Sequence, residues 1–239
     1  MPAALPLSTA SATASGPLQP SATAEQARDR LLMAALKLFA EKGFAKTSTR
    51  EIAQAAGANV AAIRYYFGDK AGLYRAAFVE PMGSPRDDIP LYDQPQLPLR
   101  QSLEIFMRCF LEPMKQGELV QHCTRLHFRE MLEPTSVWQE EIENGIRPAH
   151  AALARILCRH LGLAQADDEV HRLGFAIVAL PIHLYICRDI IDAISPRLLA
   201  DEAAIDRSVQ RLAELAMALV EAEAVRRRAA PAQPAETAR

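Results

Sequence analysis

Apolar residues recur at helical spacing through most of the chain, and no segment shows the strict alternation that predicts a strand. Turn-forming residues interrupt this pattern at Gly117, Pro134, Gly162 and Ser195-Pro196. The sequence therefore predicts an all-α fold class. The helices expected in its second half cover residues 98–115, 119–132, 135–162, 168–194 and 201–228.

A series of helix signals begins at Ser48, in the first third of the chain. Ser48 is a good N-cap, and Glu51, three residues later, completes a capping box. Gly57 follows as the expected stop, because a residue with a Cβ resists positive φ. Asn59 caps a second short helix and Asp69 caps a third. This order of helix, tight turn, short helix and helix is typical of helix-turn-helix DNA-binding segments.

The second short helix has one side for the core and one for a partner. Ile63 and Phe67, four residues apart, are expected to point into the core. Ala61 and Ala62 lie in the first turn, where small side chains allow close approach to the bases of a major groove. The exposed run Arg64-Tyr65-Tyr66 offers groups for phosphates and base edges. An ordinary corner between two helices is the alternative, but two adjacent exposed tyrosines favour DNA binding.

The segment resembles the DNA-binding domain of the TetR/AcrR family of bacterial transcriptional regulators. The resemblance covers about residues 28–80 and is long and ordered. It is carried by Leu31 to Phe39, Glu41-Lys42-Gly43-Phe44, Thr47 to Ala56, and Tyr65-Tyr66-Phe67-Gly68-Asp69-Lys70-Ala71-Gly72-Leu73-Tyr74. Two further segments resemble the CecR-like branch of the family, namely Asn59 to Gly68 and Phe128-Arg129-Glu130-Met131-Leu132-Glu133-Pro134-Thr135.

The resemblance implies which residues contact DNA. The family's base-reading positions fall on Asn59, Val60, Ala61, Ala62, Arg64 and Tyr65, and its phosphate-contacting positions fall on Thr47, Thr49, Tyr66 and Lys70. Many relatives have a basic residue at the position of Val60 and a histidine at that of Tyr66. Readout by this chain is therefore expected to depend on Arg64, Tyr65, thymine methyl groups and DNA shape.

Composition and charge agree with DNA binding at one end of the chain. Half of the 239 residues are hydrophobic, which suits one or two domains with a packed core. Residues 25–80 hold nine Lys and Arg against six Asp and Glu, a net charge of +3, whereas the remainder carries 18 against 23, a net charge of −5. Residues 25–80 are thus the expected DNA-binding domain, residues 81–97, with four prolines, an irregular linker, and residues 98–228 a helical effector-binding and dimerisation domain.

The ends of the chain and its cysteines indicate where in the cell the protein is expected to act. Residues 1–24 and 229–239 are predicted to be disordered tails, because they are rich in Ala and Pro, and residues 1–24 carry no charge. Neither a signal peptide nor a membrane helix is expected, since Pro181 and His183 break the apolar stretch near residues 173–187. Four scattered cysteines without a Cys-x-x-Cys motif indicate reduced thiols. We therefore expect a cytoplasmic protein that is not bound to a membrane.

The second half of the chain is expected to hold a small-molecule pocket. Pro181 should kink its helix and open space beside it. A few polar residues on apolar helices are typical of ligand pockets, although such residues can also lie at the surface. The family's fold implies an effector pocket, and its identity cannot be read from sequence. The candidate lining residues are Arg125, His127, Arg129, Trp138, His183, Tyr185 and Cys187.

Two pairs of residues four apart raise the alternative of metal or thiol sensing. Cys123 with His127, and His183 with Cys187, could each present a thiolate and an imidazole on one helix face. Core packing is the commoner role of an isolated Cys or His on an apolar helix. We therefore expect neither a bound metal nor a cofactor.

The last predicted helix carries a narrow apolar seam. Its members are Ile205, Val209, Leu212, Ala216 and Leu219. Such a seam packs either against the helix's own core or across a two-fold axis against a second copy. The family resemblance implies a homodimer through the last two long helices, which would present two DNA-binding segments to a pseudo-palindromic operator in double-stranded DNA.

These observations favour a ligand-responsive transcriptional repressor released from its operator by a small-molecule effector. An activator with the same DNA-binding mode and a helical interaction module are the alternatives. An enzyme is not expected, because the chain lacks a Gly-rich phosphate loop, a Gly-x-Ser-x-Gly motif and a His-Glu-x-x-His motif. Glu130 and Glu133 are three residues apart, a spacing that is typical of a solvated helix face and gives no indication of a catalytic carboxylate pair.

Overall fold

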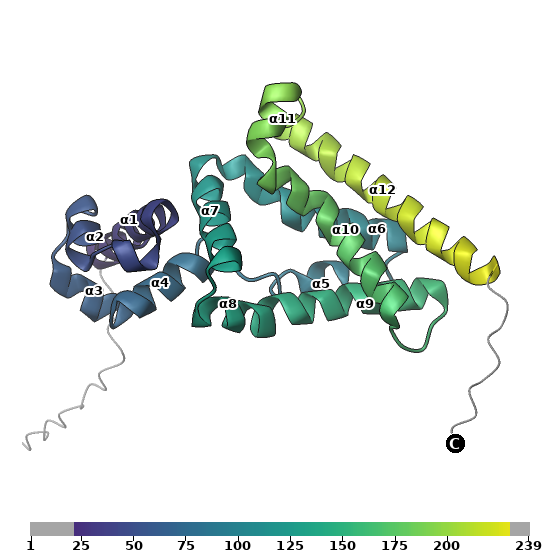
Figure 1. Ribbon diagram of the computed structural model, residues 1–239, viewed down its shortest axis with the longest axis horizontal. Helices are drawn as coiled ribbons and strands as arrows, with labels where there is room; N and C mark the ends of the chain where they lie inside the picture. The colour runs from purple at the N-terminus through teal and green to yellow at the C-terminus, as the bar shows by residue number, and fades with distance from the viewer. Residues whose placement is uncertain (1–21, 230–239) are drawn as a thin grey trace, which may run out of the picture.

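The computed structural model describes residues 22–229, so the predicted tails 1–24 and 229–239 lie almost wholly outside the described residues. Within that range the chain is helical and contains no strand, as predicted. Four helices form a head and the rest form a body (Figure 1). The head holds α1 (Ala22–Lys46, interrupted at Gly43), α2 (Thr49–Ala55), α3 (Val60–Phe67) and α4 (Lys70–Val79). The body holds α5 (Ile89–Tyr92), α6 (Leu99–Leu111), the 3-10 helix η1 (Glu112–Gln116), α7 (Glu118–Leu132), α8 (Ser136–Glu141), a π-helical turn (Ile142–Ile146), α9 (Arg147–Leu161), α10 (Asp168–Ile186), α11 (Arg188–Ile194) and α12 (Glu202–Ala229).

The head is built around the apolar face of α1. Leu36 and Phe39 of α1 are fully buried, and they meet Ile52 of α2, Ile63 of α3 and Leu73 of α4 in one hydrophobic cluster. Because α2 and α3 have only seven and eight residues, they bury little surface of their own and depend on α1 for their position. The three short helices are therefore held as one unit.

One helix of the body completes the core of the head. Cys123 and Leu126 of α7, together with Val137 of α8, are buried in the same cluster as the apolar residues of α1 to α4. Figure 1 shows α7 standing between the head and the long helices of the body. The head is thus seated on α7 and is not merely tethered by a linker.

The body has a second core, formed mainly between α6 and α12. Ile205, Val209 and Ala216 of the predicted seam are buried there, with Val209 and Ala216 fully covered. The seam therefore packs against α6 of its own protomer, which was the simpler of the two interpretations of the sequence. Only Leu219, at the end of the seam, remains exposed, at 36%.

The segment 81–97, predicted to be an irregular linker, is more ordered than expected. It contains α5, whose Tyr92 is 2% exposed and packs edge-on against Phe106. The neighbouring Asp93 accepts hydrogen bonds from Arg155 at 2.7 Å and Arg159 at 2.9 Å, both on α9. The prediction missed this anchor because four prolines dominate the local pattern.

Two predicted long helices are interrupted. Residues 135–162 form α8 and α9 joined by the π-helical turn, and residues 168–194 divide at Cys187. The helix α10 runs through Pro181, which is buried, and ends at Ile186. Contrary to expectation, α10 is long and apolar enough by length and composition to cross a membrane, with a mean hydropathy of 1.2. In the structure it packs on α9 and α12.

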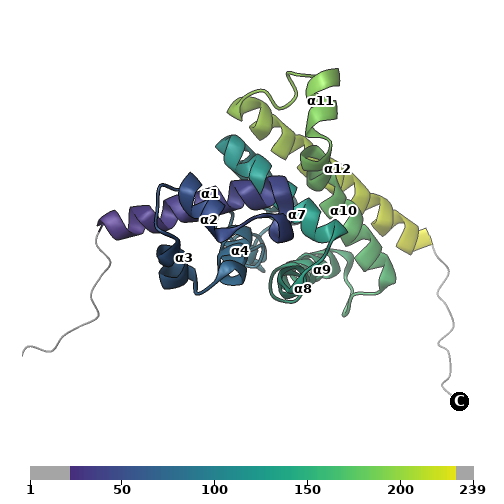
Figure 2. The same ribbon diagram turned by 60° about the vertical axis from the view of Figure 1, so that its left-hand side comes forward.

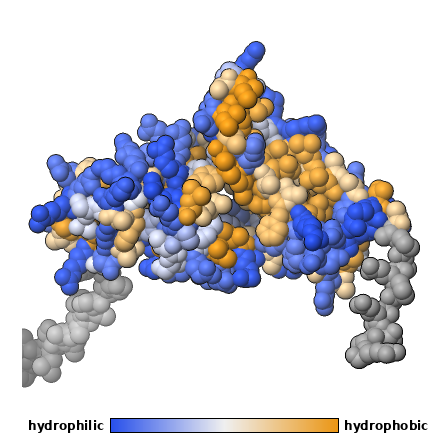
Figure 3. All heavy atoms as spheres, in the orientation of Figure 1, coloured by the Kyte–Doolittle hydropathy of each residue, from blue (hydrophilic) through white to orange (hydrophobic). Residues whose placement is uncertain are grey.

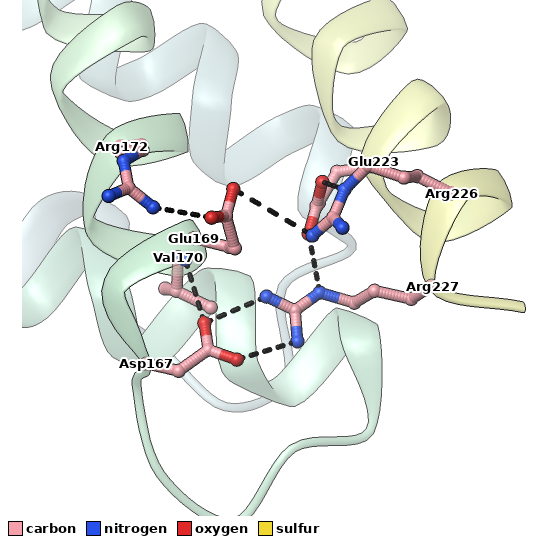
Figure 4. A network of polar contacts seen from close by, with 7 residues as sticks. All are labelled: Asp167, Glu169, Val170, Arg172, Glu223, Arg226 and Arg227. Carbon is pink, nitrogen blue, oxygen red and sulfur yellow. Dashed lines mark hydrogen bonds and ion pairs between the residues drawn. The ribbon is translucent and has the colours of Figure 1, made fainter. Parts of the chain in front are cut away.

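An ion-pair network ties the start of α10 to the end of α12 (Figure 4). Asp167 caps α10 by accepting a bond from the Val170 N–H at 2.9 Å, and it also receives two 2.8 Å bonds from the Arg227 guanidinium. Arg227 additionally donates to Glu223 at 2.6 Å. The bidentate contact with Arg227 holds the pKa of Asp167 well below its usual range.

We expect Arg227→Gln to lower the free energy of unfolding by about 1 kcal/mol, and the melting temperature by about 2–4 °C, because several partly exposed ion pairs are lost together. The neighbouring Arg228 makes no ion pair with any of residues 22–229, so Arg228→Gln is the matched control. Scanning calorimetry at low and high salt measures both. Equal melting temperatures for the two variants would contradict this account of the network.

Candidate nucleic-acid interface and body cavity

All three predicted helix caps of the head are present. The Ser48 hydroxyl oxygen accepts a bond from the Glu51 N–H at 3.1 Å, and the Asn59 side-chain oxygen accepts one from the Ala61 N–H at 2.9 Å. The Asp69 carboxylate accepts a bond from the Gly72 N–H at 2.7 Å. Each cap satisfies a backbone donor that the first turn of its helix leaves free, so the ends of α2, α3 and α4 are set by the local sequence.

Two glycines fix the angles between these helices. Gly57 has a φ of 59° and forms the turn between α2 and α3, as predicted. Gly72 lies so close to α3 that a Cβ there would be 2.0 Å from the Phe67 carbonyl oxygen. A residue with a side chain would push α4 away from the end of α3. The orientation of α3 therefore depends on both positions.

The helix α3 presents a free face at the edge of the head. Ile63 is 2% exposed and faces the core, whereas Tyr65 is 81% exposed and Val60 is 41% exposed. Arg64 is also exposed, and the rings of Tyr65 and Tyr66 meet edge-on with centroids 4.8 Å apart. Figure 2 shows α3 on the side of the head away from α10 and α12. This face can enter a groove without disturbing the core.

The positions expected to contact phosphate differ in their access. Thr49 and Tyr66 are half-buried near the free face, and Lys70, in the first turn of α4, places its ammonium 4.3 Å from the centroid of the Phe44 ring. Thr47 does not match the predicted phosphate contact, because it is 1% exposed and its hydroxyl donates to the Gly43 carbonyl at 2.8 Å. Thr47 therefore fixes the end of α1 and has no hydroxyl proton free for DNA.

A half-open cavity of about 680 Å³ lies in the body between α7, η1, α10, α11 and the start of α12. Its walls mix apolar side chains, such as Val120 and Phe128, with charged ones. Of the seven residues predicted to line a pocket, only Arg125 and Tyr185 do so. Tyr185 is fixed by a hydrogen bond from its hydroxyl to the Phe110 carbonyl.

The other five predicted pocket residues lie elsewhere. His127, Arg129 and Trp138 contact the head: the His127 ring stacks on Phe78 at 4.1 Å, Trp138 meets Phe78 edge-on at 6.4 Å, and Arg129 donates to the Glu41 carbonyl at 3.4 Å. His127 and Arg129 share α7 with part of the cavity lining but lie on the side of that helix that faces the head. Trp138 lies on α8, which contributes no residue to the lining. His183 and Cys187 lie at the end of α10 outside the cavity wall.

The two Cys and His pairs do not form one site. The His127 ring nitrogen Nδ1 bonds to the Cys123 carbonyl at 3.0 Å, and burial raises the pKa of the Cys123 thiol to about 12, which disfavours the thiolate that metals bind. The Cys187 sulfur lies 3.6 Å from the His183 Nδ1. Across residues 22–229 no group of three or more His, Cys, Asp or Glu side chains is arranged to hold a metal ion.

Sequence reasoning missed the most buried charged residue of the body. Glu130, which the spacing placed on a solvated face, is 1% exposed and accepts hydrogen bonds from Tyr74 of the head and from Thr135. The only sequence signal was its place within the segment 128–135 that resembles the CecR-like branch.

The position of His127 generates a pH prediction. Burial lowers the pKa of His127 below its usual value of 6.5 and outweighs the opposing effects of the hydrogen bond to the Cys123 carbonyl and of the Glu130 charge. The unfolded chain therefore binds a proton more readily than the folded chain, so stability falls as the pH drops through the unfolded pKa. His150, whose pKa is lowered by burial and by His171, acts in the same direction. We expect His127→Phe, which keeps an aromatic ring on Phe78, to reduce the loss of melting temperature between about pH 7.5 and about pH 5.5.

The control is His160→Phe, at the exposed end of α9. Thermal denaturation across the pH range measures both variants. If His127→Phe shows the same slope as the unmodified protein and the control, His127 does not contribute to the pH dependence.

Comparisons with known proteins agree with this geometry. Residues 31–77 match the family of bacterial regulatory proteins of the tetR type, and residues 99–222 match the C-terminal domain of the HTH-type transcriptional dual regulator CecR. The CecR protein of Shigella flexneri is 35% identical over 157 residues, which cover 61% of this chain and 70% of that protein.

Solved structures of regulators share the fold. The fatty acid degradation regulator FadR from Bacillus halodurans aligns with a TM-score of 0.58 at 18% identity, covering 86% of this chain and 97% of that one. A bacterial regulatory protein of the tetR family from Rhodococcus RHA1 aligns with a TM-score of 0.60 at 20% identity, covering 81% and 96%.

A helix-turn-helix head with a free recognition face, a helical body and matches in both regions all lead to one assignment. The chain belongs to the TetR family of DNA-binding transcriptional regulators, with a C-terminal domain of the CecR type, and is not an enzyme.

Proposed function

We propose that this protein is a ligand-responsive repressor that binds a pseudo-palindromic operator as a homodimer and leaves it when a small molecule enters the body. Residues 25–80 act as the DNA-binding domain and residues 98–228 as the effector-binding and dimerisation domain. The observation that carries the proposal is the exposed face of α3 on a head whose opposite side is completed by α7. Because its proposed partner is genomic DNA, we infer that it acts in the cytoplasm.

The residues on and around the free face of α3 have separate proposed roles in DNA binding. Arg64 donates to guanine edges, and Val60 contacts thymine methyl groups. Asn59, Ala61, Ala62 and Tyr65 complete the base-facing surface, while Thr49, Tyr66 and Lys70 hold phosphates. An activator would use the same contacts, and the CecR relative is described as a dual regulator. Repression is favoured here because a bound dimer covers its site regardless of other partners.

The cavity beside α7 is the site proposed for the effector. Its volume, about 680 Å³, suits a small organic molecule, and its mixed lining offers Arg125 and the Tyr185 ring as contacts. An effector can release the operator only if it binds the released state more tightly than the DNA-bound state. α7 is suited to carry this difference, because Phe128 faces the cavity and Leu126 faces the head.

The proposed dimer interface lies on the outer faces of α10, α11 and α12. Figure 3 shows hydrophobic residues gathered over these helices. Exposed apolar side chains that gather on one face are typical of a surface that contacts another protein. The members are Phe175, Ile190, Ile194, Leu215, Leu219 and Val225. This face replaces the Ile205 to Leu219 seam as the proposed contact with a second copy.

We expect Arg64→Ala to weaken selection of DNA by the protein. Genomic fragments are incubated with the protein, and bound fragments are sequenced. The unmodified protein should enrich one pseudo-palindrome, and the variant should enrich it at least about fivefold less, since a base contact contributes about 1–3 kcal/mol. Arg207→Ala, which removes the same charge from an exposed site on α12, is the control and should enrich normally. Equal enrichment by both variants would refute the role of α3.

We expect Phe175→Asp to convert the dimer into a monomer, because it places a charge at the proposed interface. The matched control is Leu91→Asp on α5, away from the patch; the two side chains are 63% and 51% exposed. Sedimentation velocity measures the mass relative to the 26.3 kDa chain. A dimer that survives Phe175→Asp, or a monomer in the unmodified protein, would exclude this interface.

A further inference from the structure

The segment 128–135 joins the cavity to the head. Phe128 lines the cavity, whereas Arg129 and Glu130, the next two residues, contact the head. The Arg129 guanidinium lies against Gly43, where a Cβ would be 3.1 Å from its Nη1 atom. Consecutive residues of one helix thus touch the proposed effector site and the DNA-binding unit.

Glu130 lies at the centre of this contact between α7 and the head. Its carboxylate is 1% exposed and accepts three hydrogen bonds. Tyr74 of α4 donates its hydroxyl proton, the Thr135 N–H donates at 2.9 Å, and the Thr135 hydroxyl donates at 2.9 Å. The Thr135 oxygen in turn accepts a bond from the Val137 N–H at 3.2 Å and caps α8. One carboxylate therefore connects α4, α7 and α8.

A buried carboxylate without an ion pair is costly unless its oxygens are fully hydrogen-bonded. No Lys, Arg or His side chain forms an ion pair with Glu130 among residues 22–229. Its three donors must therefore stay in place, and two belong to Thr135 on the body. The third, the Tyr74 hydroxyl, belongs to the head. Any rotation of the head that separates Tyr74 from Glu130 leaves a buried charge with one donor fewer.

Tyr74 transmits this constraint to the DNA-binding side. It is 2% exposed, and its ring meets Phe39 and Phe44 edge-on, with centroids 4.8 Å and 5.0 Å apart. Lys70, a proposed phosphate contact, lies over the other partner ring, that of Phe44. Rigid aromatic packing therefore links the Glu130 carboxylate to the start of α4.

The geometry points to Glu130 as a positioning residue that sets the orientation of the head on the body through its bond to Tyr74. This inference rests on the proposed repressor function. In a dimer the orientation of each head determines the distance between the two recognition helices. The bond is therefore the element that fixes which half-site spacing the dimer accepts, and a movement of α7 caused by a ligand would break it.

The test is Tyr74→Phe, which keeps the ring and removes only the hydroxyl. The control is Tyr92→Phe, because Tyr92 is equally buried and its hydroxyl has no hydrogen-bond partner among the described residues. Trp138, the single tryptophan of the chain, lies against Phe78 of the head, so its fluorescence reports on the contact between α8 and the head. We expect acrylamide to quench Trp138 fluorescence about twofold more strongly in Tyr74→Phe than in the unmodified protein, because the head separates from α8 more often.

The second readout uses the pseudo-palindrome enriched by the unmodified protein, with its half-sites moved apart or together by single base pairs. Tyr74→Phe should bind the original spacing about tenfold more weakly and should discriminate less among spacings. A purely structural role would lower the melting temperature without changing quenching or spacing preference at temperatures well below melting.

Glu130→Gln provides a second variant, because its amide must turn an N–H toward one of the three donors. Unchanged Trp138 quenching in both folded variants would overturn the inference, as would an unchanged spacing preference. If the unmodified protein enriches no DNA, the proposed function fails, whereas the quenching comparison still decides whether this bond holds the head.

Discussion

The structure depends on one helix of the body, α7, which packs into the hydrophobic core of the head. The head has four helices, two of them too short to stabilise themselves, and its core closes only when Cys123 and Leu126 of α7 are added. The opposite side of α7 lines the cavity of the body. Because protein interiors are close-packed, α7 cannot shift on one side without a response on the other.

This arrangement explains why the polar residues of α7 are distributed as they are. Arg125 faces the cavity, where a ligand can meet it, whereas Glu130 is buried at the head, where only Tyr74 and Thr135 can meet it. The ion pairs of Asp167 and Arg227 hold α10 to α12 at the far end of the body. The body is thus held together by ion pairs away from the head, and it is joined to the head by the packing of α7 and by the Glu130 hydrogen bonds.

Local chemistry could be predicted from the sequence, and distant contacts could not. The caps at Ser48, Asn59 and Asp69 and the turn at Gly57 follow from residue preferences within a few positions, and all are present. The free face of α3 could also be predicted, because helical periodicity depends only on residues a few positions apart.

Periodicity alone does not identify the partner of an apolar or charged face. The seam of α12 fits its own core and a second copy equally well, and the structure places it on α6. Glu130 looked solvated because its partner Tyr74 is 56 residues away. The prediction that His127 and Trp138 line a pocket was wrong because the sequence does not show which residues of α7 and α8 face the head.

The most direct test of this account is hydrogen exchange of the α7 amides, residues 118–132, with and without the DNA fragment that the protein enriches. If α7 completes the head, binding of DNA should slow exchange in α3 and also in α7, because both belong to one cooperative unit. Slower exchange in the head, with no change in α7, would contradict the central claim that α7 is part of the core of the head.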